Sequence, residues 1–267
     1  MLSLKQIKSF YKNAGKIDDR NLLREYLQYL ILDKVFSSTL ADKLNFMGGT
    51  CLRICYANDR FSEDLDFDNF ELEVKRVKNL FEKVVTVFKR EKYNFEFDFK
   101  KTKNGGRGRL RFSDLLYQLE ISSNPKEKLM IRLDFTNQKR TETEVLLLAE
   151  FGMGERVVTN TLPVLLSQKT KALIQRKQTR GRDFYDIYWL LSKEIKPNLE
   201  SLKIVNIDSE AKFFLKLKEI YQKEKGKIPL FKGQIRPFLI HEKNIRYLDF
   251  LGDIIKSSYD WKVAGAS

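Results

Sequence analysis

Residues 46–68 read Phe-Met-Gly-Gly-Thr-Cys-Leu-Arg-Ile-Cys-Tyr-Ala-Asn-Asp-Arg-Phe-Ser-Glu-Asp-Leu-Asp-Phe-Asp. Asp64 and Asp66 are separated by one residue in an alternating run, so in an extended strand both carboxylates would project from one face while Leu65 and Phe67 point into a core. Two carboxylates held together repel each other unless a cation lies between them. A hard divalent ion with oxygen ligands, of which magnesium fits best, would relieve this repulsion.

A pair of glycines opens the same stretch. Gly48 and Gly49 free the backbone to approach a phosphate group, and Thr50 offers a hydroxyl and is expected to cap a short helix over 50–56. Residues 46–49 should form a short strand that runs into this turn. The diglycine turn and the acid pair together predict a metal-dependent site for a nucleoside triphosphate.

A third carboxylate, Asp134, lies in a later alternating run, residues 129–136. Three carboxylates on adjacent strands can hold two magnesium ions, which stabilise the attacking and leaving oxygens of a phosphoryl displacement. Asp134 could also accept the proton of the attacking hydroxyl. The alternative is that Asp134 forms a salt bridge with Arg132 or another surface base.

Three further residues lie close to the acid pair in sequence. Arg60 and Ser62 precede the acids and are candidates for nucleotide binding, although Arg60 could equally pair with a local carboxylate. Asp68 continues the face of Asp64 and Asp66, so it could be a fourth acid of the site, but we expect it to be only the next exposed residue.

A second group of candidate residues follows at 168–188. Lys169 and Arg176 would lie two turns apart on one face of a helix, where an ammonium and a guanidinium fork could carry triphosphate charge. The alternative is a solvated helix face. Asp183 and Asp186 begin the next helix, where a carboxylate is also common in the first turn. The basic residues of this stretch are Lys169, Lys171, Arg176, Lys177, Arg180 and Arg182.

Composition narrows the class of protein. The 267 residues are 42% hydrophobic and 32% charged, which is typical of a globular chain with ample core. The net charge of +14 favours polyanionic partners such as RNA, unless the lysines only solvate the surface. One histidine excludes imidazole clusters, and the two cysteines are expected to be reduced thiols. We find no signal peptide or membrane-spanning run and expect a cytoplasmic protein.

The periodicities predict a mixed α/β half followed by an all-helical half. Helical spacing covers residues 3–13, 18–40 and 72–91, and strand-like alternation covers 64–70, 93–100, 108–121, 129–136 and 143–149. From about residue 161 we expect only helices, over 162–176, 183–191, 207–224 and 236–257. We therefore place domains at 1–158 and 159–267, and leave open which half the first two helices pack against.

The order of these motifs resembles a known family. Gly48-Gly49-Thr50-x-Leu52-Arg53, then Arg60-x-Ser62-x-Asp64-Leu65-Asp66-Phe67, is similar to the first motif of the AbiEii/AbiGii-type toxin nucleotidyltransferases. The later stretches 169–176 and 182–187 resemble the downstream motifs of that family. The resemblance spans roughly residues 20–195.

The resemblance implies a polymerase-beta-like nucleotidyltransferase fold of the α+β class, a small mixed sheet flanked by helices, followed by a C-terminal helical bundle. It implies that Asp64, Asp66 and Asp134 bind metal and that Gly49 and Thr50 contact the nucleotide phosphates. Lys169 matches the family lysine that engages triphosphate, and Asp183 matches an aspartate required for activity.

The function implied is that of a magnesium-dependent toxin of a toxin–antitoxin or phage-defence system, with a cognate antitoxin as partner. Some members of the family transfer a nucleotide from a nucleoside triphosphate to the 3′ end of tRNA. The sequence leaves open a protein or small-molecule hydroxyl as the acceptor, and also a non-catalytic RNA-binding module. The three acids at 64, 66 and 134 disfavour a degenerate site.

Overall fold

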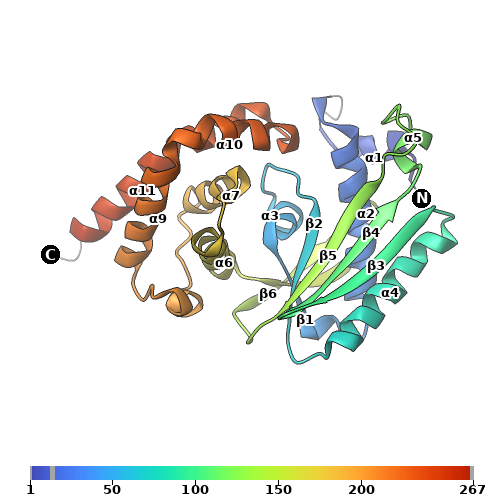
Figure 1. Cartoon of the computed structure of the whole chain (residues 1–267), viewed down its shortest axis with the longest axis horizontal. Helices are drawn as coiled ribbons and strands as arrows, with labels where there is room; N and C mark the ends of the chain where they lie inside the picture. Colours follow the sequence, from blue (N-terminus) through green and yellow to red (C-terminus); the bar gives the residue numbers. More distant parts are fainter. Residues whose placement is uncertain (1, 13–15, 265–267) are drawn as a thin grey trace. The chain divides into compact units, whose positions relative to one another are not determined.

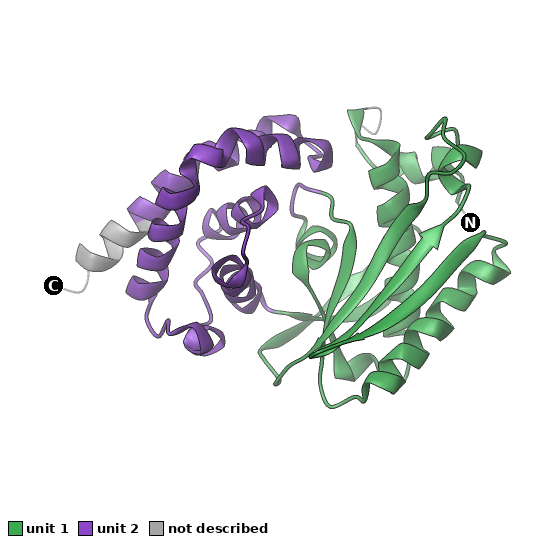
Figure 2. Ribbon diagram, viewed as in Figure 1, with its two compact units in different colours: residues 1–57, 61–160 green, residues 58–60, 161–267 purple. Residues whose placement is uncertain are grey.

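The computed structural model describes residues 2–12 and 16–264, with side chains up to residue 257 (Figure 1). The chain forms two compact units. Unit 1 comprises residues 1–57 and 61–160, and unit 2 comprises residues 58–60 and 161–267 (Figure 2). A short piece of the motif region, Asn58–Arg60, therefore belongs to the helical unit, which the sequence did not predict.

Unit 1 is built on one seven-stranded sheet, which confirms the mixed sheet that the family resemblance implied. The strand order is β3-β4-β5-β2-β1-β7-β6, with β2 parallel to β5, β1 parallel to β7, and antiparallel pairing elsewhere. The strands are β1 (Leu44–Met47), β2 (Asp64–Asn69), β3 (Phe95–Thr102), β4 (Gly105–Phe112), β5 (Leu129–Asn137), β6 (Thr143–Leu148) and β7 (Glu155–Asn160).

Two long helices pack on one face of this sheet. The Phe67 ring on β2 lies 6.3 Å from the Phe36 ring of α2 and 5.9 Å from the Phe81 ring of α4, and Phe81 also contacts Phe135 of β5. Since neighbouring residues of a strand point to opposite faces, Asp64, Asp66 and Asp134 lie on the other face. The helices of unit 1 are α1 (Leu4–Ser9), α2 (Asp19–Phe36), η2 (Ala41–Lys43), α3 (Gly48–Tyr56), α4 (Val74–Arg90) and α5 (Leu115–Gln118).

The sequence Gly-Arg-Gly-Arg-Leu-Arg-Phe explains the two faces of β4. Its glycines, leucine and phenylalanine at 106, 108, 110 and 112 are buried, while its arginines point outward. A Cβ on Gly106 would lie 2.4 Å from the Phe99 ring and 2.6 Å from the Phe135 ring, so only glycine fits beneath these aromatic side chains. The core side of β4 is therefore closed by phenylalanines from its neighbours.

Helix α3 is fixed to α2 by a buried ion pair. The Arg53 guanidinium donates to both carboxylate oxygens of Glu25 at 2.8 and 3.0 Å, and Glu25 is 4% exposed. The hydroxyl of Tyr11 donates to the same carboxylate at 2.8 Å. The first helices thus belong to unit 1, which the sequence had left open.

Unit 2 is helical, as predicted. Its core forms around α7, where the Phe184 ring lies 5.5 Å from Phe231 of α10 and 6.5 Å from Tyr221 of α9. The segment 58–60 joins this unit through a hydrogen bond from the Ile240 amide to the Asp59 carbonyl. The helices are α6 (Leu162–Gln175), α7 (Gly181–Leu191), α8 (Leu199–Leu202), η3 (Lys203–Val205), α9 (Glu210–Glu224), η4 (Lys225–Lys227), α10 (Ile228–Ile235), η5 (Arg236–Phe238), η6 (Glu242–Arg246) and α11 (Tyr247–Ala264).

Several predicted elements differ from the structure. The strand expected over 108–121 is β4, which ends at Phe112 and is followed by the short helix α5. Strand β7 was missed, although its Val-Val-Thr run is typical of strands. The helix expected over 236–257 is divided into η5, η6 and α11. Residue 13, at the end of the first predicted helix, lies outside the described residues. None of the helices in the described ranges is long and apolar enough to cross a membrane.

Candidate active site

The register of the central strands places the three predicted acids on one face. Strands β2 and β5 are parallel, with Asp66 opposite Asp134 and Asp64 opposite Arg132. Neighbouring strands are about 4.8 Å apart, so Asp66 and Asp134 are adjacent side chains, and Asp64 lies one side-chain position along β2. All three are partly exposed. Residues 70 positions apart in the sequence therefore form one acidic patch.

The diglycine turn lies directly against Asp66. Met47, the residue before the turn, pairs with Asp66 across the antiparallel strands β1 and β2. Gly48 has a φ of +84°, and a Cβ there would lie 2.4 Å from Oδ2 of Asp66. Position 48 therefore requires glycine for its backbone conformation and for the room that the Asp66 carboxylate needs.

The role predicted for Thr50 as a helix cap is wrong. Helix α3 begins at Gly48 with Met47 at its N-cap, and that residue makes no capping side-chain hydrogen bond. Thr50 is fully buried, and its hydroxyl donates to the backbone carbonyl of Asp64. Thr50 thus joins the first turn of α3 to the start of the acid strand. The Ser62 carbonyl accepts a hydrogen bond from Gln28 at 3.0 Å, which fixes the approach to that strand from α2.

Two arginines hold two of the acids. Arg132 donates to both oxygens of Asp64, one of them at 2.7 Å, and Arg107 on β4 donates to Asp134 at 2.9–3.0 Å. The salt bridge that the sequence analysis left open for Asp134 is therefore present, but its partner is Arg107. Hydrogen bonds to these carboxylates raise the pKa of both Arg132 and Arg107. The sequence analysis did not identify Arg107. The alternation of arginines with glycine and apolar residues along β4 is the signal that could have indicated it.

The positions of the three acids on the sheet suit a hard cation, but the carboxylates of Asp64 and Asp134 accept hydrogen bonds from arginines. Asp64, Asp66 and Asp134 supply carboxylate oxygens from adjacent positions of one sheet face, the donor type that Mg²⁺ prefers. In the ranges described, no group of three or more His, Cys, Asp or Glu side chains is arranged to hold a metal ion. A cation would therefore bind as Asp64 and Asp134 turn away from their guanidinium partners.

Asp68 is buried, which contradicts the prediction that it is exposed. It is 0% exposed and accepts a hydrogen bond from Asn160 Nδ2 at 2.7 Å. Asn160 in turn accepts from Asn45 Nδ2 at 2.8 Å and from the Thr141 hydroxyl at 3.1 Å. This polar network joins β1, β2 and β7. Asp68 therefore helps to hold the sheet together, and its burial was not predicted because its partner Asn160 lies on β7, a strand that the sequence analysis did not identify.

In unit 2, two of the predicted basic residues meet at one buried carboxylate. Asp186 of α7 is fully buried and binds the Arg60 guanidinium at 2.6 and 2.7 Å and the Lys169 ammonium at 2.7 Å. Asn58 also donates to it at 3.1 Å. Burial alone would raise the pKa of Asp186, but the charges of Arg60 and Lys169 outweigh burial and lower it to about 2. Of the two alternatives for Arg60, the structure shows pairing with a carboxylate, but this carboxylate is 126 residues away in the sequence and is not local.

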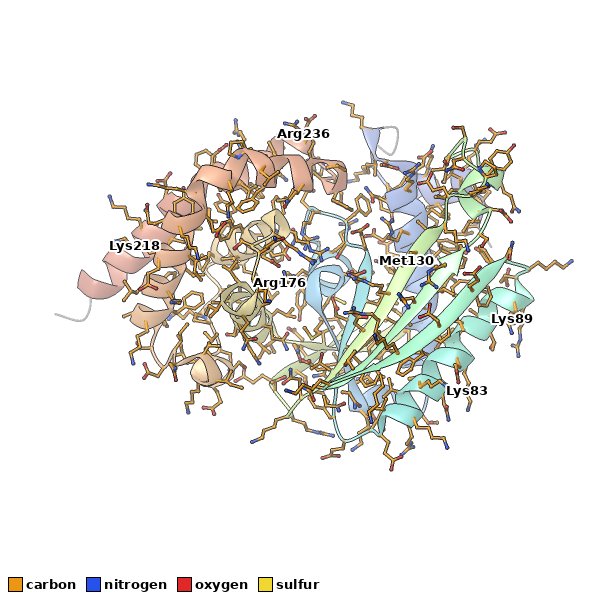
Figure 3. The ribbon with its side chains drawn as sticks, in the orientation of Figure 1. Lys83, Lys89, Met130, Arg176, Lys218 and Arg236 are labelled. Atoms are coloured by element: carbon orange, nitrogen blue, oxygen red, sulfur yellow. The ribbon has the colours of Figure 1, made fainter. Side chains whose placement is uncertain are left out.

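Arg176 and Asp183 form a second ion pair in unit 2. Arg176 is the residue after α6, in extended conformation, rather than a member of that helix, and its guanidinium binds the buried Asp183 in the first turn of α7 (Figure 3). Lys169 is 13% exposed and Arg176 is 35% exposed at the side chain. Lys169 and Arg176, the two predicted triphosphate contacts, are therefore both paired with acidic residues of α7.

Comparison with known proteins agrees with these features. A family model described as "Nucleotidyl transferase AbiEii toxin, Type IV TA system" matches residues 30–261. No curated protein matches the chain. The crystal structure of JHP933 from Helicobacter pylori has a TM-score of 0.57 at 18% identity, over 94% of this chain and 98% of that one.

A second solved structure is MenT4, a nucleotidyltransferase toxin from Mycobacterium tuberculosis. It has a TM-score of 0.56 at 14% identity, over 98% of this chain and 93% of that one. These likenesses support the fold, and the family match covers most of the chain. The chain belongs to the AbiEii family of nucleotidyltransferase toxins and is a nucleotidyltransferase of a toxin–antitoxin system.

Proposed function

We propose that this nucleotidyltransferase depends on Mg²⁺ and transfers a nucleotide from a nucleoside triphosphate to an RNA acceptor, the 3′ end of a tRNA. The observation that carries the proposal is the register that sets Asp66 beside Asp134, with the turn at Gly48 against Asp66. An acceptor hydroxyl attacks the α-phosphate, the new phosphodiester bond forms, and pyrophosphate leaves.

The acids of unit 1 have distinct roles in this reaction. Asp64 and Asp66 would hold the metal ions, together with Asp134. Two such ions supply charge stabilisation for the attacking and leaving oxygens. Asp134 is also the carboxylate that would take the proton from the attacking hydroxyl. Arg132 and Arg107 hold the carboxylates of Asp64 and Asp134 by hydrogen bonds until the substrate complex arrives.

The first turn of α3 is the proposed phosphate site in unit 1. Gly48 and Gly49 open the helix, and helix N-termini favour anions through free amide groups and the helix dipole. Thr50 helps to position this turn, because its hydroxyl donates a hydrogen bond to the backbone carbonyl of Asp64. In unit 2, Lys169 and Arg176 are the proposed triphosphate contacts, with Asp183 holding Arg176 in place.

Charge favours RNA as the acceptor. A net charge of +14 suits a polyanion, and a cationic small molecule such as an aminoglycoside would be repelled. Of the basic segments 75–109 and 169–182, we propose that residues 95–109 and 169–182 contact the RNA backbone, because α4 packs on the face of the sheet opposite to the acids. The family description names a toxin–antitoxin system, so a cognate antitoxin is a further proposed partner.

The direct test supplies the protein with total tRNA, Mg²⁺ and each of the four labelled nucleoside triphosphates. We expect label at the RNA 3′ end, lost with a chelator, restored by Mg²⁺ and abolished in Asp66→Asn. Asp208→Asn, an exposed acid of unit 2 paired with Lys212, is the matched control and should keep activity. Label on protein instead of RNA, or transfer that survives the chelator, would refute the proposal.

A further inference from the structure

The open face of the sheet carries a row of arginines that begins beside the acids. Arg107, Arg109 and Arg111 alternate with buried residues along β4, so all three point to the face of Asp66 and Asp134. Residues two apart in a strand are about 7 Å apart. We call these three residues the arginine row.

The register fixes the direction of the arginine row. Arg107 pairs with Asp134, which pairs with Asp66. Arg109 pairs with Arg132, and Arg111 pairs with Met130, which Figure 3 labels on β5. Because Arg132 pairs with Asp64, the row runs beside the acids at Arg107 and Arg109 and extends beyond them along β4 at Arg111.

The outer two arginines are available for a ligand. Arg109 and Arg111 share one carboxylate, Asp98 on β3, at 2.5–2.9 Å. Asp98 fixes the orientation of both guanidinium groups, but its single negative charge balances only one of their two positive charges. The side chains of Arg109 and Arg111 are 42% and 25% exposed. Lys100 of β3, which is exposed, pairs with Arg107 across the two strands and adds a further positive charge on this face.

We propose that the arginine row binds the phosphates of the acceptor RNA strand just upstream of its 3′ end. This inference rests on the proposed function and specifies its substrate surface. A terminal hydroxyl at Asp66 and Asp134 would place the preceding phosphates along β4. Guanidinium forks bind phosphate through paired hydrogen bonds, and their planes can also stack on unpaired bases.

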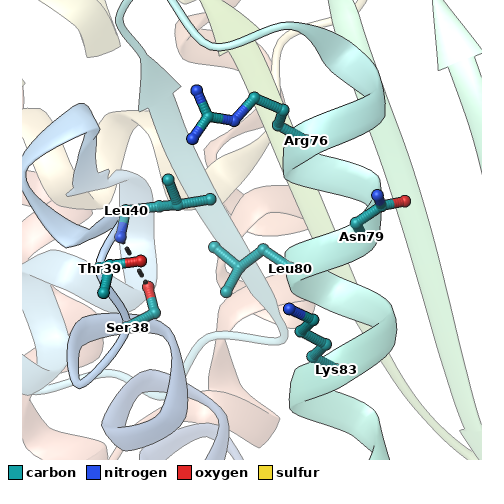
Figure 4. Close-up of a pocket in the computed structure, with 7 residues that line it drawn as sticks. All are labelled: Ser38, Thr39, Leu40, Arg76, Asn79, Leu80 and Lys83. Carbon is teal, nitrogen blue, oxygen red and sulfur yellow. Dashed lines mark hydrogen bonds between the residues drawn. The ribbon is translucent and has the colours of Figure 1, made fainter.

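The second basic surface of unit 1 provides a contrast. Helix α4 lines a pocket with residues 38–40, and Arg76 and Lys83 extend from α4 on the side that faces these residues (Figure 4). Because Phe81 of α4 packs on Phe67 and Phe135, this pocket lies on the face of the sheet opposite to the acids. An RNA strand that ends at Asp66 would not reach it.

Binding of RNA is best measured in the inactive variant Asp66→Asn, so that no transfer intervenes. A fluorescent single-stranded RNA ending in the tRNA acceptor sequence is titrated at several salt concentrations. In that background, Arg109→Gln/Arg111→Gln should weaken binding about ten-fold and reduce the salt slope by about two, one per lost phosphate contact. Asp98→Asn should tighten binding, because it frees both guanidinium groups.

The matched control is Arg76→Gln/Lys83→Gln, which removes two charges from the opposite face and should leave binding unchanged. With Asp66 retained, thermal stabilisation by Mg²⁺ and a nucleoside triphosphate should persist in both double variants, which shows that each is folded. Equal weakening by the α4 variant, or wild-type binding by the β4 variant, would overturn the inference. So would β4-dependent capture of an acidic protein without any binding of RNA.

The two proposals fail separately. If the active protein labels RNA but the β4 variant binds RNA normally, the arginine row is wrong and the proposed function stands. If RNA binding depends on the arginine row but no nucleotide is ever transferred to RNA, the acceptor in the proposed function is wrong and the RNA surface stands.

Discussion

Arg132 on β5 donates two hydrogen bonds to the carboxylate of Asp64, the residue directly opposite it on β2. The side chain of Asp64 is 13% exposed and that of Arg132 is 30% exposed, so the pair is partly screened by solvent. An arginine therefore balances the acid charge in the place where a cation is proposed. Arg132 and a metal ion would therefore compete for the carboxylate of Asp64.

Arg132→Gln should bind divalent metal more tightly than the wild type. The half-exposed ion pair is worth up to about 1 kcal/mol, which corresponds to roughly two- to five-fold in affinity. Calorimetric titration with Mn²⁺ in the absence of nucleotide measures this directly. Arg156→Gln, at an exposed position of β7, is the control and should match the wild type. Weaker Mn²⁺ binding by Arg132→Gln would show that the arginine supports the metal site.

Gly48→Ala should abolish transfer, whereas Gly152→Ala should not. Both glycines have positive φ, +84° and +78°, so both substitutions carry a similar backbone strain of about 1–2 kcal/mol. Only at Gly48 would the new methyl group meet Asp66, because Gly152 has no neighbour within 4 Å. A displaced Asp66 should lower the transfer rate about 100-fold or more. Equal activity of the two variants at matched thermal stability would contradict the contact between Gly48 and the acid.

The face of each central strand was predictable because strand alternation is local. Leu65, Phe67 and Phe135 are buried as expected, and Asp66 and Asp134 lie on the other side. The sequence could not show that β2 and β5 are neighbours in this register. The family resemblance implied that the three acids lie together, and the parallel pairing of β2 with β5 explains how they do so.

The errors at Thr50 and Asp68 have a common physical cause. Their hydrogen-bond partners come from other elements, the Asp64 carbonyl for Thr50 and Asn160 for Asp68. Local rules assign a threonine at a helix start to capping and an acid on a polar face to solvent. Tertiary contacts override both rules, and strand β7, which carries Asn160, was itself not predicted. The same applies to Arg60, whose partner Asp186 is 126 residues away.

Asp186→Asn should destabilise unit 2 strongly. The substitution removes the charge that compensates Arg60, which is 3% exposed, and Lys169, and loss of one partner of a buried ion pair costs about 3–5 kcal/mol. Urea unfolding followed by tryptophan fluorescence reports on this unit, since both tryptophans, 189 and 261, lie within it. Asp208→Asn should change the free energy of unfolding little, because that acid is exposed. A similar small change in Asp186→Asn would contradict the burial of the cluster.

The stabilising effect of Asp186 should disappear in acid. Its pKa in the folded chain is about 2, below its ordinary value of 3.8, so the unfolded chain takes up the proton first as the pH falls. The effect is therefore complete above about pH 4 and is lost between about pH 4 and pH 2, an amount of about 2 kcal/mol. The difference in unfolding free energy between wild type and Asp186→Asn should shrink by that amount over this window. A difference that stays constant from pH 6 to pH 2 would mean that Asp186 is not ionised between Arg60 and Lys169.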